Sequence, residues 1–450
     1  MAIHSSAIVP ARKLGGGGSI QSCRLMSRFL AKLFIVVVMG NGLIANYAPD
    51  IGVNAGTLCI DVMCLVLLFV AIISEISSHQ NTRSIIVSAP VFIVFLVIAI
   101  LTMVSVLVVG VYSRGLLSDL RIRFLYFLVA PSLYVLLRPS DVKSVFQFFI
   151  DCGVFFCIFA IVQFTFASVL DPKLLSVRYD GTLALSWSES TGSFVLRSNA
   201  LMGNAIEFGG VAVMLFASAL SEVFEHGANP TRIAKVTVIA VGCYFSYSRV
   251  ACVALVVIFV VLFFRMSRAR GMNKFLRFIV LFALLGISLY VLLGNSELVG
   301  RFMGSDEFTT SSNLAHANNT KKVLQAIGEN PIFGTGLGTQ LVSDTRSTAD
   351  GWWFQLAAET GVFVLMLYVG LYIALGRGLY ASQGRDSGIT EELSIVCLAC
   401  LVYFLVVSFI NSSFAGRADL TLFMTLVGLW LASLPNGPMF RGSTNRCKLD

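Results

Sequence analysis

Five arginines lie beside long apolar runs, where a permanent charge is costly and usually has a partner or a function. They are Arg197, Arg249, Arg301, Arg346 and Arg417. Arg249 stands in SYSRVA, between two apolar runs with almost no polar sequence around it. A guanidinium stays protonated and can grip a phosphate through two parallel N–H groups. Several arginines on one face would therefore suit a diphosphate, and snorkelling to the interface or pairing with Asp and Glu is the structural alternative.

A second group of polar residues opens a late apolar run in STADGWWFQLAAETG, residues 347 to 361. Asp350 precedes the run and is a candidate proton acceptor, with an ordinary helix cap as the alternative. Trp352, Gln355 and Glu359 have the spacing that places side chains on one helix face. Trp352 and Trp353 stand at the level where aromatic residues favour the membrane interface. Glu359 is deeper in the run, so it must face water or the protein interior, for example in a buried ion pair.

The stretch HANNTKKVLQAIGENPIFGTGLG, residues 316 to 338, lies between these groups. Its first part has the apolar stripe of a short amphipathic helix, with Lys321 among the polar positions and ENP as its end. The glycines of NPIFGTGLG resemble a phosphate loop, but the GK[ST] that ends such a loop is missing. We therefore predict a turn-rich connector there. His316 is a candidate for chemistry, and a solvated surface position is the alternative.

Other polar residues inside apolar runs allow a different interpretation. Asp61, Asp151 and Glu207 could line a proton or ion path, although they are spread over separate runs without obvious partners. The CxxC at Cys397 and Cys400 lies inside an apolar run, so helix packing is favoured over metal or redox chemistry. We expect no metal and no cofactor.

The composition indicates that membrane-spanning helices position these residues. Of the 450 residues, 57% are hydrophobic and only 12% are charged, whereas about 25% of a soluble domain is charged. We predict an all-α polytopic membrane protein with about 12 spans, each of about 20 apolar residues. The expected spans are 29–48, 55–74, 85–109, 122–137, 145–170, 204–222, 233–247, 250–265, 276–294, 352–376, 392–414 and 419–434.

Basic residues predict the orientation of these spans. Most of the 32 lysines and arginines fall on one side if the N-terminus is cytoplasmic, as the positive-inside rule requires. The net charge of +8 is then an orientation signal rather than evidence for nucleic-acid binding. The predicted order is a cytoplasmic tail at 1–28, spans at 29–294 with an outer loop at 171–203, a long outer loop at 295–351 that holds the amphipathic helix, spans at 352–434 and a cytoplasmic tail at 435–450.

Taken together, SYSRVA, TKKVLQAIGENPIFGTGLG, ADGWWFQLAAETG and LRSNALMGNAIEFGG resemble the O-antigen ligase and polymerase superfamily, most closely the Wzy-type polysaccharide polymerases. The resemblance is loose over residues 140 to 430 and closer over 320 to 370. It implies an enzyme of the bacterial inner membrane whose active site faces the periplasm. Members transfer a glycan from a polyprenyl diphosphate to a hydroxyl of an acceptor, without a metal.

The resemblance also suggests roles for the residues singled out above. Arg249 and Asp350 are the catalytic candidates, and Arg249, Arg197, Arg301, Lys321 and Arg346 are candidates for binding the donor diphosphate. Trp352, Trp353, Gln355, Glu359, His316 and Arg417 would bind the glycan or support the site. Membrane lipids, the lipid-linked oligosaccharide, a flippase and a chain-length regulator are the implied partners, and nucleic acid is not.

Two alternatives remain open. Ligases of the family usually carry histidine and asparagine where this chain has Asp350 and Gly351, and polymerases often carry aspartate there, so the aspartate favours a polymerase. The family also often has an arginine at the start of the amphipathic helix, where this chain has Lys321 and Lys322.

The alternative from another class is a transporter or flippase. A flippase should carry polar groups through the full membrane depth, whereas here they concentrate in the outer loops.

Overall fold

The structure is a computed structural model that describes residues 17–48, 55–77, 97–109, 120–175, 185–188, 193–269, 307–337, 351–383, 388–409 and 417–434. Its first half contains α1 (Gly17–Met39), α2 (Asn41–Tyr47), α3 (Ala55–Ser77), the π-helical turn η1 (Arg121–Leu125), the short 3-10 turn η2 (Tyr126–Leu128), α6 (Val129–Leu136), α7 (Pro139–Thr165) and η3 (Pro172–Leu174). The second half contains α8 (Ala205–His226), α9 (Pro230–Phe245), α10 (Arg249–Ala269), α13 (Glu307–Glu329), α15 (Trp352–Thr360), α16 (Val362–Ser382), α17 (Ile389–Val407) and α18 (Arg417–Ser433).

Strands β1 (Leu185–Ser188) and β2 (Ser193–Leu196) form a small antiparallel hairpin between the two halves. The prediction of an all-α protein is therefore correct for the bundle and wrong for this hairpin, which lies in the predicted outer loop at 171–203. β2 ends directly before Arg197, so the hairpin delivers one of the candidate arginines to the bundle.

Five described helices are long and apolar enough to cross a membrane: Ala55–Ile76, Pro139–Thr165, Ala205–His226, Val362–Ser382 and Ile389–Val407. A sixth span results if α1 and α2, which are bent by 63°, are counted together. Shorter apolar helices occupy Val97–Val109 and Val250–Phe263. The described chain is thus helical and polytopic, as predicted. The expected total of about 12 spans is not confirmed, and the predicted span at 276–294 lies outside the described residues.

Two predicted spans are broken rather than continuous. The span at 29–48 breaks at Gly40, after which α2 turns aside, and the Leu43 amide donates to the Leu201 carbonyl at 3.1 Å. The span at 352–376 breaks at Gly361, which separates the nine-residue α15 from α16. Hydropathy did not predict either break, because each lies inside a run that is apolar on average.

The two ends of the bundle can be told apart by the contacts of α8 and α17. Ser221, late in α8, donates to Glu392, early in α17, at 3.0 Å, so the two helices run antiparallel. We call the end at which α8 begins and α17 finishes the site end. α15 begins there, because the Trp353 amide approaches the carbonyl of Ser408 at 3.4 Å. At the opposite end, Arg28 of α1 pairs with Asp141 of α7.

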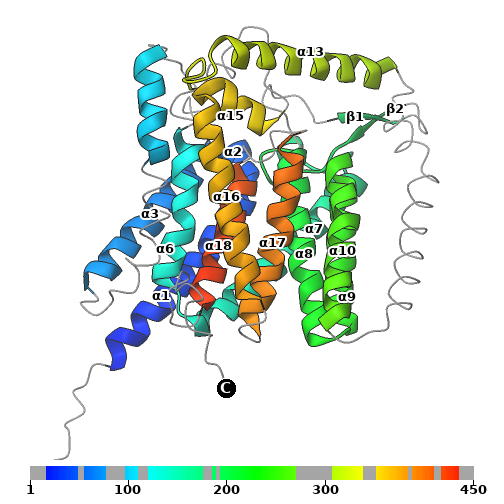
Figure 1. Ribbon diagram of the computed structural model, residues 1–450. Coiled ribbons are helices and arrows are strands. Elements are labelled where there is room, and N and C mark those ends of the chain that lie inside the picture. Colours follow the sequence, from blue (N-terminus) through cyan, green and yellow to red (C-terminus); the bar gives the residue numbers. More distant parts are fainter. Residues whose placement is uncertain are drawn as a thin grey trace, which may run out of the picture.

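Helix α13 lies across the site end of the bundle, above α15 and near the β1–β2 hairpin (Figure 1). It packs on α15 through Val323, which contacts Ala358 within a small apolar cluster. The predicted amphipathic helix is therefore present and ends at Glu329, in the ENP sequence, as expected. It is longer than predicted, because its 23 residues begin at Glu307.

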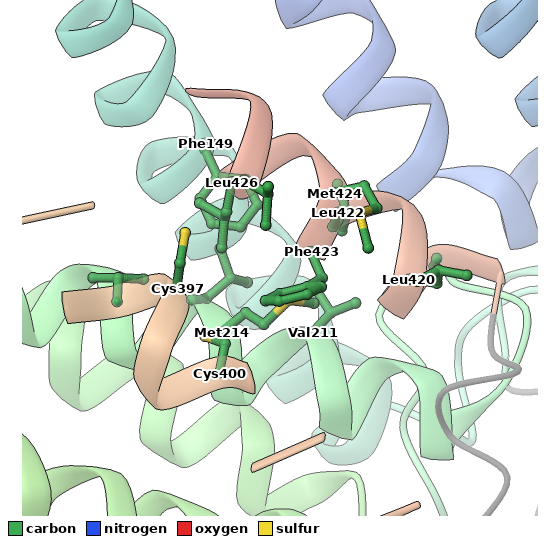
Figure 2. Close-up of a cluster of buried hydrophobic side chains, with 14 of the residues drawn as sticks. Phe149, Val211, Met214, Cys397, Cys400, Leu420, Leu422, Phe423, Met424 and Leu426 are labelled. Carbon is green, nitrogen blue, oxygen red and sulfur yellow. The ribbon is translucent and has the colours of Figure 1, made fainter. Parts of the chain in front are cut away.

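The core holds α7, α8, α17 and α18 together. Figure 2 shows Phe149 of α7, Met214 of α8 and Phe423 of α18 in one buried cluster with Cys397 and Cys400 of α17. Both cysteines are free thiols and are fully buried. The prediction that this CxxC serves helix packing is thus confirmed.

Candidate functional site

The turn between α9 and α10 is the sequence SYSR, and it places Arg249 at the first position of α10. Tyr247 has a φ of 50°, which lets the chain reverse within a few residues. The Ser246 hydroxyl donates to the Cys243 carbonyl at 2.6 Å and accepts from the Ser248 amide at 3.2 Å. The two serines therefore build the turn that presents Arg249, whose side chain lies outside the described part of the structure.

Arg197 contacts this same turn. Its Nε donates to the Ser246 carbonyl at 3.2 Å, and the next amide, of Ser198, donates to the Phe245 carbonyl at 3.0 Å. The side chain of Arg197 is half-buried. Arg197, one of the arginines predicted to bind a diphosphate, therefore contacts the turn that leads into Arg249, although the two arginines are far apart in the sequence.

A carboxyl side chain stands at the start of α8, the helix that packs against the SYSR turn. Asn204 caps this helix, accepting from the amides of Ile206 and Glu207 at 2.9 and 2.8 Å. Glu207 is buried and accepts from the backbone amide of Arg417 at 3.3 Å. A Cβ added to Gly209 would lie 3.0 Å from the Cβ of Ser248, which places the start of α8 against the SYSR turn.

Arg417 begins α18 and joins this cluster from another side. Its Nη1 donates to the Thr57 hydroxyl near the start of α3. Asp419, in the first turn of α18, is completely buried. A Cβ added to Gly210 would lie 2.5 Å from Asp419 Oδ2, so the carboxyl group packs directly on the α8 backbone. Three helix starts, those of α3, α8 and α18, thus meet in one polar cluster.

The carboxylates that the sequence left without partners have partners in the structure. Asp61 accepts from Arg121 at 2.6 Å and from the Tyr126 hydroxyl at 2.9 Å. Asp151 pairs with Lys235 at 2.6 Å. The sequence did not identify these partners, and their pairing weakens the case for a proton or ion path.

Glu359 of α15 forms a buried ion pair with Arg123 of η1. The side chain of Arg123 is 4% exposed and that of Glu359 is 0% exposed. Gln355, one turn earlier on α15, donates to Glu359 at 3.3 Å. The buried ion pair considered as the alternative for Glu359 is confirmed, and the predicted shared helix face of Gln355 and Glu359 is present.

Trp352 and Trp353 are buried, at 3% and 4% exposure. Trp352 packs edge-on against Trp353 and Tyr368, with ring centroids 4.7 and 5.5 Å apart, and Trp353 packs against Tyr372 at 5.9 Å. Both rings are thus packed among other aromatic rings of the bundle, and the membrane level expected for them stays a prediction. These packing contacts favour a supporting role over stacking on a sugar.

The glycine-rich NPIFGTG turn is a clamp on the break between α15 and α16. Thr335 donates its amide to the Ala358 carbonyl at 2.7 Å, and Gly336 donates to the Glu359 carbonyl at 3.0 Å. These carbonyls end α15 and would otherwise lack helical partners. Gly334 has a φ of 69°, and a Cβ there would lie 2.5 Å from the carbonyl carbon of Glu359. The predicted connector is thus a structural clamp whose glycines allow backbone to pack on backbone.

Several predicted site residues are not brought to the cluster by the described structure. Arg301, Arg346 and Asp350 lie outside the described residues. His316 lies within α13, but its side chain is outside the described part. Lys321 is exposed on α13, and its helix position is opposite Val323, which faces α15, so the structure does not place it with the arginines.

Gly351, not Asp350, is the N-cap residue of α15, with φ −149° and ψ 126°. The interpretation of Asp350 as the helix cap is therefore wrong in position, because Asp350 precedes the cap.

No group of three or more His, Cys, Asp or Glu side chains converges on a possible metal site within the described residues.

Sequence reasoning missed Arg121 and Arg123. Both stand in RIRFL, at the start of the predicted span 122–137, and the rule that charged residues beside apolar runs have partners or functions applies equally to them. That signal would have identified the two arginines but not their partners, which come from α3 and α15.

The chain is similar to one protein family over part of its length. Residues 234–369 match the model of the O-antigen ligase family, Wzy_C. The matched segment contains the SYSR turn, α13, the NPIFGTG clamp and α15. No curated protein matches the chain. Residues 234–369 of the chain are therefore similar to the O-antigen ligase family, and this match supports its place in the O-antigen ligase and polymerase superfamily.

Proposed function

We propose that the protein is a polysaccharide repeat-unit polymerase. It transfers a growing glycan from a polyprenyl diphosphate to a hydroxyl of a second lipid-linked glycan, at the periplasmic face of the bacterial inner membrane. The observation that carries the proposal is the contact of Arg197 with the turn that presents Arg249. This contact supports the proposal that the guanidinium groups of Arg197 and Arg249 both bind the departing diphosphate.

The chemistry needs what these residues offer. When the anomeric carbon is attacked, the diphosphate departs and its negative charge increases. Fixed positive groups in a partly dehydrated site stabilise that charge, so we assign the diphosphate to Arg197 and Arg249. Arg301 and Arg346, from the long loop, are further candidates for the same anion.

The attacking hydroxyl needs an acceptor for its proton or a group that orients it. We assign this role to Asp350, which directly precedes the N-cap of α15. α15 itself starts at the site end, where α17 finishes. Glu207 lies at the same end and contacts Arg417, so it would contribute to holding the acceptor side of the site.

The second candidate function is a ligase, which transfers a finished glycan once to a different acceptor. It is favoured by the description of the matching family, O-antigen ligase. Asp350 favours the polymerase, because family ligases usually carry a histidine at that place.

Reconstitution in proteoliposomes with purified lipid-linked repeat units tests the proposal. A polymerase produces a ladder of lengthening lipid-linked chains from the repeat unit alone. A ligase produces no ladder and makes one transfer when a foreign lipid acceptor is added. Absence of both products, with folded protein in the membrane, would contradict the proposed glycan transfer altogether.

A further inference from the structure

Two arginines of one π-helical turn, η1, form ion pairs with two different helices. Arg121 pairs with Asp61 of α3 at 2.6 Å, and Arg123 pairs with Glu359 of α15. π-helical turns are rare and occur often at functional sites. The turn also contacts α16, because the Tyr368 hydroxyl donates to the Arg123 carbonyl at 3.1 Å. η1 therefore connects the N-terminal half of the chain to the segment that matches the O-antigen ligase family.

Glu359 is the residue of α15 to which η1 is bound. Its carboxylate accepts hydrogen bonds from the side chains of Arg123 and Gln355. Its backbone carbonyl accepts one from the Gly336 amide of the clamp. Side chain and backbone of one residue are thus fixed by two separate segments. Since α15 is only nine residues long, a shift at Glu359 moves its other end, whose N-cap Gly351 directly follows Asp350 in the sequence.

We infer that Arg123 is a positioning residue: through its ion pair with Glu359 it fixes α15, and so sets where this helix begins relative to Arg197 and the SYSR turn. This rests on the proposed function only for its effect on the reaction rate. The mechanical part, that the ion pair fixes α15 against α17, stands on the contacts alone.

A purely stabilising ion pair is the alternative. Burying two charges is so costly that replacing a buried pair by uncharged side chains of similar size often leaves stability unchanged or raised. Removing one partner alone is different, because it leaves a buried charge uncompensated. Removal of both charges together therefore separates positioning from folding.

The test variant is Arg123→Met with Glu359→Gln, which removes both charges and keeps similar volumes. Its matched control is Arg28→Met with Asp141→Asn, which treats an ion pair at the opposite end in the same way. Small misplacements of reacting groups can lower rates by about 10²-fold. We expect kcat of the test variant to fall by about that factor, with the KM for the lipid donor nearly unchanged. The control should keep both constants.

An activity-independent measurement uses Phe354 of α15 and Phe409 after α17, whose ring centroids lie 6.3 Å apart. Both are changed to Cys in a background without native cysteines, and the rate of crosslinking by a short bismaleimide is measured. We expect the rate to fall in the Arg123→Met/Glu359→Gln background and to stay unchanged in the Arg28→Met/Asp141→Asn background.

An unchanged crosslinking rate in the test background would overturn the inference, whether or not the protein polymerises glycans. A slower rate with an unchanged kcat would overturn the catalytic consequence. If the double variant does not fold, Arg123→Lys replaces it. Lysine keeps the charge but not the fork, so it should give a smaller fall in both crosslinking rate and kcat. A wild-type protein without transferase activity would contradict the proposed function, while the crosslinking rate would still decide whether Arg123 positions α15.

Discussion

The Nε of Arg197 lies 3.2 Å from the carbonyl oxygen of Ser246, a residue 49 positions later in the chain. Ser246 belongs to the turn that leads directly into Arg249. Arg197 follows the β hairpin and Arg249 begins α10, so two separate elements meet at the SYSR turn. This relationship makes the two arginines testable as a pair.

We expect Arg197→Ala and Arg249→Ala each to lower the rate of polymer formation. Loss of a single donor to a developing negative charge typically costs about 10²–10³-fold in kcat. Arg249→Lys should also be slow, because an ammonium cannot reproduce the planar fork. The initial rate in proteoliposomes, normalised to the amount of folded protein, measures the effect.

Arg28→Gln serves as the control for these substitutions, because Arg28 pairs with Asp141 at the opposite end of the bundle. Its rate should match that of the wild type. If Arg249→Ala keeps a near-normal rate, the assignment of the diphosphate to this arginine is wrong.

Asp350→Asn should leave the protein folded and remove most of its activity. Loss of a general base typically lowers the rate by about 10²–10⁴-fold. Asp350→Glu keeps a carboxylate and should retain part of the activity. Since Gly351 is the N-cap of α15, a change at Asp350 should leave the cap itself in place. Polymerisation assays at equal membrane expression would discard the catalytic role if Asp350→Asn were as fast as the wild type.

The orientation of the bundle can be checked by cysteine labelling. We expect a cysteine at Ser311, in α13, to react with an impermeant reagent in intact spheroplasts, because the predicted loop at 295–351 is periplasmic. A cysteine at Ser267, in the basic segment after the eighth predicted span, should react only after the membrane is opened. The reverse pattern would place the site end in the cytoplasm and exclude the proposed donor reaction there.

Local sequence patterns predicted individual elements well where a polar break or an apolar helix face was visible within a short stretch of sequence. The SYSR break between two spans is the turn between α9 and α10, and the apolar stripe around Val323 is the face of α13 that packs on α15. In both cases the information lies within a few neighbouring residues, so periodicity and hydropathy were sufficient.

Pairings between distant segments could not be predicted in the same way. Arg123 and Glu359 are 236 positions apart, and nothing in either local sequence identifies the other. The breaks at Gly40 and Gly361 were missed because hydropathy measures how apolar a run is and not its direction. The role of NPIFGTG was also hidden, since Gly334 is required by its close approach to the backbone at the end of α15.

Gly210→Ala should destabilise the protein by placing a methyl group against a buried carboxyl group. The new Cβ would lie 2.5 Å from Asp419 Oδ2, so α8 and α18 would have to move apart. Overpacking of this kind costs about 1–3 kcal/mol. Gly370→Ala on α16 is the control, because no atom of the described residues lies within 4 Å of its Cβ position. Thermal unfolding in detergent should show a lower midpoint for Gly210→Ala alone, and equal midpoints would contradict the close contact of Asp419 with α8.

Gly361→Ala tests the clamp between the NPIFGTG turn and the broken span. Gly361 has a φ of 85°, and an added Cβ would lie 1.9 Å from the carbonyl oxygen of Ile332. The substitution therefore combines backbone strain with a collision against the main chain of the clamp, which no rotamer can relieve.

Gly227→Ala separates the two effects, because its φ of 83° gives the same strain while no described atom lies within 4 Å of the added Cβ. We expect Gly227→Ala to cost about 1–3 kcal/mol through strain alone and to leave kcat unchanged. Gly361→Ala should cost more and also lower kcat, since the Val362 amide would lose the Pro331 carbonyl that it contacts at 2.9 Å and α15 would lose its fixed end. Unfolding midpoints and single-turnover rates of the two variants measure these effects, and equal losses of stability with equal rates would show that the clamp does not position α15.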